Sequence, residues 1–209
     1  MNTEKNAARN KTVKKIINAA KHEFSRQGFS RATIESITKR AGVGKGTFYL
    51  YFKTKEDVIK YMIDEMTDSV IEILDSAMKK LADENIAFDV FFKKIMLLTL
   101  REYMKLKDIM LIVVYTNYVI SSELNSFRDR RLMEIKERVK RIFELGIKGV
   151  YIRKTDPEAA AAFLINAFMY FSIEVLFKEG PGRLEHYVDV IGDMIFHGLM
   201  IRREAKKRG

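Results

Sequence analysis

Apolar residues recur at helical spacing along nearly the whole chain. The first stripe, at spacings of 3, 1, 3 and 4, predicts a helix and consists of Val13, Ile16, Ile17, Ala20 and Phe24. The same periodicity predicts short helices over 33–41 and 45–52. Longer ones are predicted over 55–80, 86–106, 108–120, 122–150, 157–178 and 184–205. No segment alternates with period two for long enough to predict a strand, so the pattern indicates an all-α protein of about nine helices.

Residue types at the predicted helix ends support these boundaries. Gly28 and Gly42 follow the first two helices, where a left-handed backbone conformation favours glycine. Thr33 is placed to cap the start of the second helix. Thr54 and Asp57 have the spacing of a capping box, in which the two side chains bind each other's free backbone N–H groups. A long helix is therefore expected to begin at about residue 55.

The two short helices have the spacing of a helix-turn-helix, a motif that places its second helix in the major groove of DNA. Apolar residues are expected to pack the two helices together and onto Phe24; these are Ile34, Ile37, Val43, Phe48 and Phe52. Gly44 and Gly46 leave the backbone open to close approach by a phosphate. Hydrogen-bond donors for phosphates and base edges are offered by Lys45, Thr47, Tyr49, Tyr51 and Lys55.

Positive charge is concentrated at the start of the chain. The net charge is +10, and residues 1–60 hold 14 Lys and Arg against 5 Asp and Glu. This asymmetry predicts an anionic partner for the first third, either nucleic acid or an acidic membrane surface. A solvated charged face would give the same composition.

The residue types needed for catalysis or metal binding are sparse. The chain has no cysteine and three histidines, and no Ser/His/Asp ordering is present, so we predict no enzyme activity, no cofactor and no metal. Residues 42–47 lack the spacing of a phosphate-binding loop. One polar stripe could ligate a metal, although a solvated surface is the preferred interpretation; it consists of His186, Asp189, Asp193 and His197.

The last two predicted helices favour self-association. Residues 159–177 are apolar on almost every side, so the segment has to be covered on more than one face. A second copy of the chain is the natural cover, which predicts a homodimer through the last two helices. Neither this segment nor 109–120 has the pattern of a membrane span, and no membrane association is expected.

The body is also rich in Phe, Tyr and Met, which is compatible with a cavity for a hydrophobic ligand. Three polar residues within its apolar stretches are candidates to orient such a ligand: Asn117, Asn166 and Glu174. Core hydrogen bonds or dimer contacts would explain the same residues and are the preferred interpretation.

Residues 29–37 and 41–56 resemble the N-terminal domain of TetR-type (tetracycline-repressor-like) transcriptional regulators. The resemblance covers about residues 11–60 and rests on the glycine turn, Lys45-Gly46, the run Tyr49-Leu50-Tyr51-Phe52 and Lys55-Glu56. The rest of the chain is similar only in length and architecture. Gly44 is a departure, because many members carry serine there.

This resemblance implies a DNA-binding domain at 1–54 and a ligand-binding and dimerisation domain at 55–209. It implies phosphate contacts by Thr33, Tyr49 and Lys55, with Gly44, Lys45, Thr47 and Tyr51 facing the groove. The expected protein is a cytoplasmic repressor that binds a palindromic double-stranded operator as a dimer and is released by a small, hydrophobic effector. A lipid-binding or membrane-surface protein, and an architectural DNA binder without inducer, remain alternatives.

Overall fold

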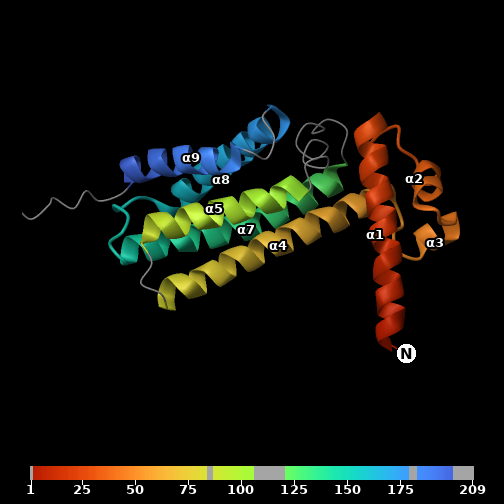
Figure 1. The fold of residues 1–209 in the computed structure, drawn as a ribbon, viewed down its shortest axis with the longest axis horizontal. Helices are drawn as coiled ribbons and strands as arrows, with labels where there is room; N and C mark the ends of the chain where they lie inside the picture. The colour runs from red at the N-terminus through yellow and green to blue at the C-terminus, as the bar shows by residue number, and fades with distance from the viewer. Residues whose placement is uncertain (1, 84–86, 106–120, 179–182, 200–209) are drawn as a thin grey trace, which may run out of the picture. The chain divides into compact units, whose positions relative to one another are not determined.

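The computed structural model describes residues 2–83, 87–105, 121–178 and 183–199 (Figure 1). Within them the chain forms eight α-helices and no β-strand, which confirms the all-α prediction. The helices are α1 (Asn2–Gln27), α2 (Ile34–Ala41), α3 (Lys45–Tyr49), α4 (Lys55–Asp83), α5 (Phe88–Lys105), α7 (Ser122–Lys148), α8 (Pro157–Lys178) and α9 (Leu184–Leu199). The helix predicted over 108–120 and the asparagine at 117 lie outside the described residues.

The chain divides into two compact units. The first unit comprises residues 1–67 and 106–131, and the second comprises 68–105 and 132–209. Helices α4 and α7 contribute to both units. The two compact units meet within α4, after Thr67. The domain boundary between residues 54 and 55 remains a prediction.

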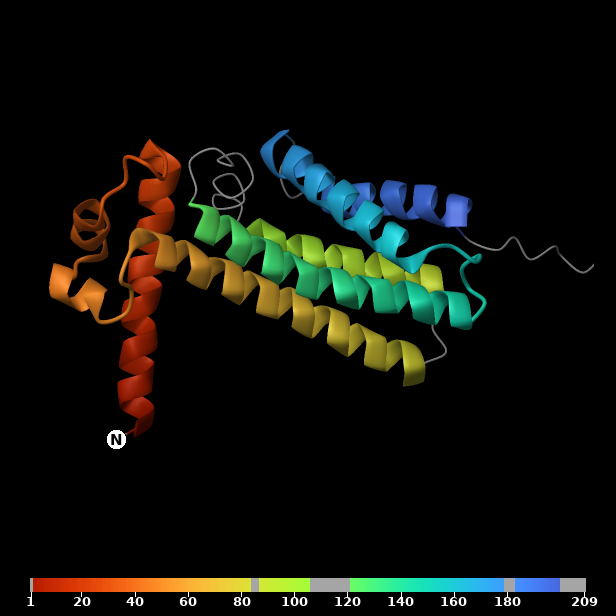
Figure 2. The ribbon, with the colours of Figure 1, turned by 180° about the vertical axis from the view of Figure 1, so that it is seen from behind.

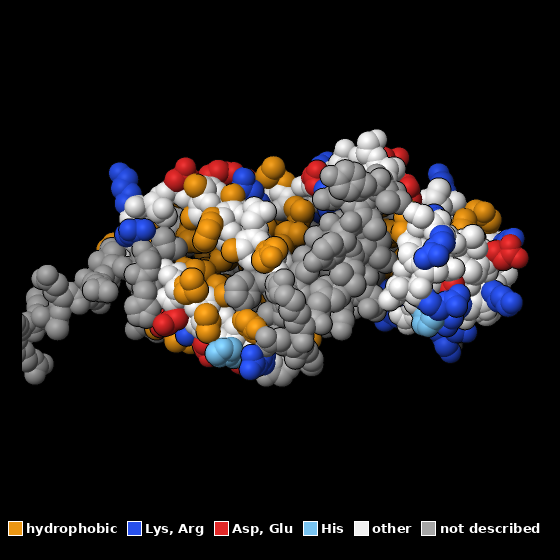
Figure 3. Space-filling view, turned by 90° about the horizontal axis from the view of Figure 1, so that it is seen from above, with side chains coloured by type: hydrophobic (Ala, Val, Ile, Leu, Met, Phe, Trp, Pro, Cys, Tyr) orange, Lys and Arg blue, Asp and Glu red, His pale blue; other side chains and the backbone are white. Residues whose placement is uncertain are grey.

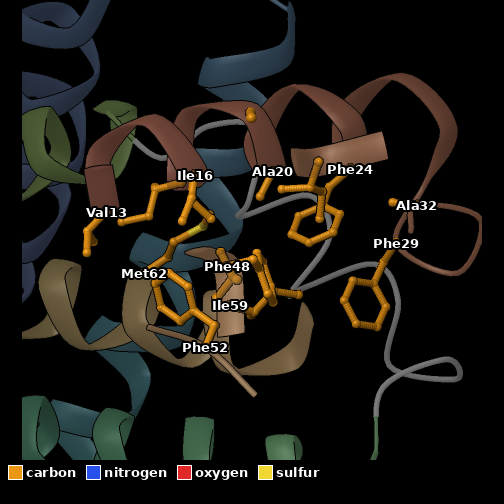
Figure 4. Packing of buried hydrophobic residues seen from close by; sticks show 14 of the residues in the cluster. Val13, Ile16, Ala20, Phe24, Phe29, Ala32, Phe48, Phe52, Ile59 and Met62 are labelled. Atoms are coloured by element: carbon orange, nitrogen blue, oxygen red, sulfur yellow. The ribbon is translucent and has the colours of Figure 1, made fainter. Parts of the chain in front are cut away.

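The core of the first unit lies where α1, α2, α3 and the start of α4 meet (Figure 4). All five residues of the predicted α1 stripe are buried there, as expected from their spacing. Ile37, Phe48, Val58, Ile59 and Met62 are completely buried in the same cluster. Burial of a large apolar side chain contributes about 1.5–3 kcal/mol relative to exposure, so this cluster holds the short helices in place.

Backbone geometry confirms the predicted helix ends. Gly28 and Gly42 have φ angles of 81° and 67°, which is the left-handed conformation expected after a helix. At the start of α4, the N–H of Asp57 donates to Oγ1 of Thr54 over 3.1 Å. The carboxylate of Asp57 in turn accepts from the N–H of Thr54 over 2.9 Å, which completes the predicted capping box.

The second unit is a bundle of long helices. Figures 1 and 2 show the C-terminal part of α4 beside α5 and α7, with α8 and α9 on the opposite side of α5 and α7 from it. Ion pairs join its helices at the surface: Asp75 of α4 with Arg138 of α7 at 3.1 Å, and Lys93 of α5 with Asp189 of α9 at 3.0 Å. None of the described helices is long and apolar enough to cross a membrane.

Large apolar side chains are exposed on α8 and α9. Phe163 and Tyr170 of α8 are 71% and 68% exposed, and Met194 of α9 is 72% exposed. Figure 3 shows hydrophobic side chains gathered on the surface of the second unit. This distribution agrees with the prediction that the segment around 159–177 is apolar on more than one side.

Candidate nucleic-acid interface

The α2–α3 pair stands on a rigid apolar base. Phe48 of α3 is completely buried, and its ring centroid lies 5.8 Å from that of Phe52. Phe24 of α1 contacts Phe29 edge to face at 5.3 Å, which fills the space beside the loop before α2 (Figure 4). The outer face of α3 is therefore held in one orientation by side chains on its inner face.

Thr33 caps α2, as predicted. Its Oγ1 accepts the N–H of Ser36 over 3.1 Å, and its own N–H donates to Oγ of Ser36 over 3.2 Å. These reciprocal bonds form a capping box. Thr33 is exposed beside them, and its predicted phosphate contact remains a prediction.

Helix α3 carries several of the residues that were predicted to contact DNA. Lys45, Gly46 and Tyr49 are exposed, Thr47 is half-buried, and Gly44 lies exposed immediately before the helix. A Cβ at Gly44 or Gly46 would meet no atom within 4 Å, and neither has a positive φ. Because packing within the protein does not require these glycines, their effect is to leave the backbone open to an external partner.

The two tyrosines have different surroundings. Tyr49 is 56% exposed, with its ring edge-on to that of Phe48 at 5.7 Å. Tyr51 is half-buried, and the guanidinium of Arg9 lies 6.0 Å from its ring centroid. Tyr49 is therefore the more accessible donor for a phosphate, while Tyr51 also packs against the core of the first unit.

Lys45 has an acidic neighbour. Its Nζ lies 3.1 Å from Oε2 of Glu35 on α2, and both side chains are exposed. An exposed pair of this kind contributes little to stability and is weakened by salt. A phosphate can therefore replace the carboxylate as the partner of Lys45.

Lys55 is held by the protein itself, which differs from the phosphate role expected of it. Its Nζ donates to three backbone carbonyls of the loop before α2: Phe29 at 2.7 Å, Ser30 at 3.1 Å and Ala32 at 2.9 Å. An ammonium group has three donor hydrogens, so these bonds use all of them. The ammonium also lies 4.5 Å from the ring centroid of Phe29, and burial lowers the pKa of Lys55. In this structure Lys55 fastens α4 to the α1–α2 loop and has no donor left for a phosphate.

A second buried polar contact links α1 to α2 and was not predicted. The carboxylate of Glu23 is almost completely buried and accepts from Nε of Arg40 over 2.5 Å. The amide of Gln27 also donates to it, over 2.7 Å. The hydrogen bond from Arg40 lowers the pKa of the Glu23 carboxyl and outweighs the opposing effect of burial.

Replacing Glu23 by glutamine is expected to destabilise the protein in a pH-dependent way. The pKa of Glu23 is lowered in the folded state, so its contribution is present above the ordinary value of 4.5 and is lost as the pH falls through the folded pKa. At pH 7 we expect a loss of about 2 kcal/mol, the scale of hydrogen bonds to charged groups. Urea denaturation at pH 7 and at pH 3.5 measures the difference, which should shrink at the lower pH. The exposed Glu35→Gln is the control and should change stability by less than about 0.5 kcal/mol at either pH. An equal loss for Glu23→Gln at both pH values would contradict this account.

Comparisons with known proteins agree with this geometry. The family model described as "Bacterial regulatory proteins, tetR family" matches residues 16–62, which contain the α2–α3 pair. The helix-turn-helix-type transcriptional regulator YhgD of Bacillus subtilis (strain 168) is 27% identical over 164 residues, covering 75% of this chain and 80% of the relative. The chain carries a DNA-binding domain of the TetR type at residues 16–62. It is a transcriptional regulator with a DNA-binding domain, and not an enzyme.

Solved structures of other regulators share the fold. The fatty acid degradation regulator FadR from Bacillus halodurans superimposes with a TM-score of 0.72 at 21% identity, covering 93% of this chain and 97% of that one. A complex of SmeT with triclosan gives a TM-score of 0.76 at 19% identity, covering 92% and 93%. At these identities the likeness establishes the fold of this chain and leaves its ligand open.

Of the three residues predicted to orient a ligand, only Asn166 has a side chain that the structure describes. Asn166 is exposed, and its Nδ2 donates to the carbonyl of Ala162 one turn earlier in α8, over 2.8 Å. Glu174 lies on α8 within the part whose side chains are not described. A cavity in the second unit is instead lined by other residues, among them Thr99 and Tyr103 of α5.

No metal-binding cluster of three or more His, Cys, Asp or Glu side chains occurs within the described ranges of the regulator. In the predicted polar stripe of α9, Asp189 forms its ion pair with Lys93. His186 is exposed in the same helix. Asp189 and His186 therefore lie at the surface of α9.

Proposed function

We propose that this regulator is a repressor that binds a palindromic DNA operator as a dimer and is released by a small, hydrophobic effector. The observation that supports operator binding most strongly is the α3 helix, fixed from below by Phe48 and open above at Lys45, Thr47 and Tyr49. Two such helices related by a two-fold axis would enter successive major grooves about 34–36 Å apart. Thr33, Gly44, Gly46 and Tyr51 would complete the contact surface, with Lys55 holding the loop behind it.

Exposed apolar side chains support a dimer through α8 and α9. Phe163, Ile191 and Met194 line a hollow of about 390 Å³ between the two helices. An apolar surface of this kind favours burial against a second copy of the chain.

The apolar cavity of the second unit supports a hydrophobic effector. FadR is described as a regulator of fatty acid degradation, and SmeT was solved in complex with triclosan, an apolar compound. An effector releases DNA only if it binds the DNA-incompetent geometry more tightly than the competent one. The second unit and the helices α4 and α7, which contribute to both units, are where such a preference would act.

Selection from a library of random duplexes tests operator binding by the full-length protein. At low ionic strength we expect enrichment of a palindrome whose half-sites are centred about 10–10.5 base pairs, or a multiple of that, apart. Tyr49→Ala should weaken binding to the selected duplex by about tenfold or more, measured by fluorescence anisotropy. Leu50→Ala, which removes the exposed side chain immediately after α3, is the matched control.

A protein that binds no duplex would contradict the proposal. Co-sedimentation with anionic phospholipid vesicles, without duplex binding, would support the membrane-surface alternative. Duplex binding that no hydrophobic compound weakens would support the architectural alternative.

A further inference from the structure

The second unit contains a cavity of about 60 Å³ between α4, α5, α7 and α8. Most of its wall is hydrocarbon or aromatic, as with Val70, Met96, Ile135 and Phe168. On the same measure a single water needs about 10–15 Å³, so there is room for a compact organic molecule. Two of the lining residues, Thr99 and Tyr103, carry a hydroxyl group.

Thr99 carries a hydroxyl without a partner. The residue is only 9% exposed, and its Oγ1 is buried with no hydrogen bond. An unpaired buried hydroxyl is destabilising, and buried polar side chains in folded proteins are nearly always hydrogen-bonded. Valine would fill the same volume without this penalty, so the hydroxyl indicates a partner that the protein chain does not supply.

Tyr103 lies one helical turn further along α5, on the same face. It is 3% exposed, and its ring centroid lies 5.8 Å from that of Phe168. Burial raises the pKa of Tyr103 to about 12, so its phenol stays protonated and able to donate at neutral pH. Thr99 and Tyr103 therefore offer one hydroxyl that can accept or donate and one that donates.

No charged residue is present among the described residues that line the cavity. A carboxylate or ammonium group entering it would lose hydration without gaining an opposite charge. An uncharged oxygen would lose less and could bond to both hydroxyls. The wall therefore discriminates on ligand charge as well as on size.

We infer that this cavity binds a compact, uncharged molecule that has an apolar body and one oxygen held between Thr99 and Tyr103. Alcohols, phenols and ketones fit this description, whereas carboxylates and amines do not. The inference rests on the proposed function where it takes this cavity as the effector site. It adds the chemical class of the effector and two residues that recognise it.

A matched series of small aromatic probes tests the class. Full-length protein labelled with ¹³C at isoleucine and methionine methyl groups is titrated with benzyl alcohol, benzoate, benzylammonium and toluene. Benzyl alcohol should shift the methyl signals of Ile95, Met96 and Ile135 at the cavity. At pH 7.5 we expect it to bind at least about 100-fold more tightly than benzoate, because only a minute fraction of a carboxylic acid with an ordinary pKa is then neutral. The affinity for benzoate should rise about tenfold per pH unit lowered, while that for benzyl alcohol stays constant.

Two variants test the residues. Thr99→Val and Tyr103→Phe keep side-chain volume and remove the hydroxyls, so both should fold. Together they should weaken benzyl alcohol binding by about 10–100-fold, the effect of two hydrogen bonds, and leave toluene binding unchanged. Thr99→Ser retains the hydroxyl and should bind benzyl alcohol like the original protein.

Tight binding of benzoate or benzylammonium at pH 7.5, undiminished benzyl alcohol binding by the double variant, or no response of the cavity methyl groups to benzyl alcohol would each overturn the inference. Duplex binding is measured separately on the same samples. If benzyl alcohol occupies the cavity and the selected duplex stays bound, the inference on ligand class stands, and release by this ligand class fails. If charged probes bind instead and release the duplex, the proposed function stands and this inference falls.

Discussion

Replacing Phe48 by alanine is expected to lower the free energy of unfolding of the first unit by about 3–5 kcal/mol and to abolish duplex binding. Phe48 is completely buried where α3 meets the rest of the core, and its ring lies beside that of Phe52. The truncation removes apolar contacts and leaves a cavity under a helix of only five residues. So short a helix has little stability of its own, because helix stability in proteins comes mostly from tertiary packing. Amide hydrogen exchange of α1–α3 in the full-length protein measures the change.

Leu50 provides the control for this substitution. It is 77% exposed and immediately follows α3. Leu50→Ala should therefore change the free energy of unfolding obtained from the same exchange rates by less than about 0.5 kcal/mol. If Phe48→Ala retained native exchange protection in α2 and α3, the view that the buried face fixes the recognition helix would be wrong.

Replacing Lys55 by methionine is expected to weaken duplex binding by about tenfold or more without changing its salt dependence. The substitution leaves the carbonyls of Phe29, Ser30 and Ala32 without their shared donor, so the loop that leads into α2 loses its fastening. A phosphate ligand would behave differently, because each phosphate contact that is lost reduces the slope of log affinity against log salt by about 0.9. Anisotropy titrations from 50 to 200 mM salt distinguish the two roles.

Lys45→Met is the comparison for Lys55→Met. Lys45 is exposed on α3, with only the surface carboxylate of Glu35 beside it, and its removal should reduce the salt slope by about 0.9 while the protein stays stable. Hydrogen exchange in residues 29–33 should rise in the Lys55 variant alone. A reduced slope and unchanged exchange for Lys55→Met would restore its interpretation as a phosphate ligand.

Local patterns in the sequence were enough to predict the helices and the packing of the first unit. The α1 stripe from Val13 to Phe24 follows from helical spacing, and the positive φ of Gly28 and Gly42 follows from the absence of a side chain. Capping by Thr33 and Thr54 depends on residues three positions away, so it also can be predicted from sequence. Two ends differed: α1 begins well before its stripe, and α3 stops at Tyr49 before the predicted end.

Contacts between distant residues were not predictable in the same way. The donors and acceptors around Lys55 are 23 to 26 positions apart, and Glu23 is 17 positions from Arg40. A lysine after a capping threonine has the same sequence signature whether it faces solvent or a loop. Only the path of the chain decides, and that path depends on the whole core.

The cavity shows the same limit for ligand recognition. Asn166 attracted attention because it interrupts an apolar run, yet it is exposed and bonds to its own helix. Thr99 and Tyr103 were not predicted to orient a ligand, because a threonine and a tyrosine are common among the residues of an amphipathic helix. Their significance depends on burial and on an unpaired oxygen atom, which no spacing rule reports.

The exposed side chains of Phe163, Tyr170 and Met194 have a consequence for how affinity is measured. If two copies join through α8 and α9 as proposed, they associate by mass action, and the population able to bridge both half-sites falls as the protein is diluted. Titrations at nanomolar protein concentration would then depend on the equilibrium constant of dimer association as well as on that of operator binding. Below the dissociation constant of the dimer, the curve of bound duplex against protein concentration should become steeper. Two copies linked covalently in tandem should remove this steepness.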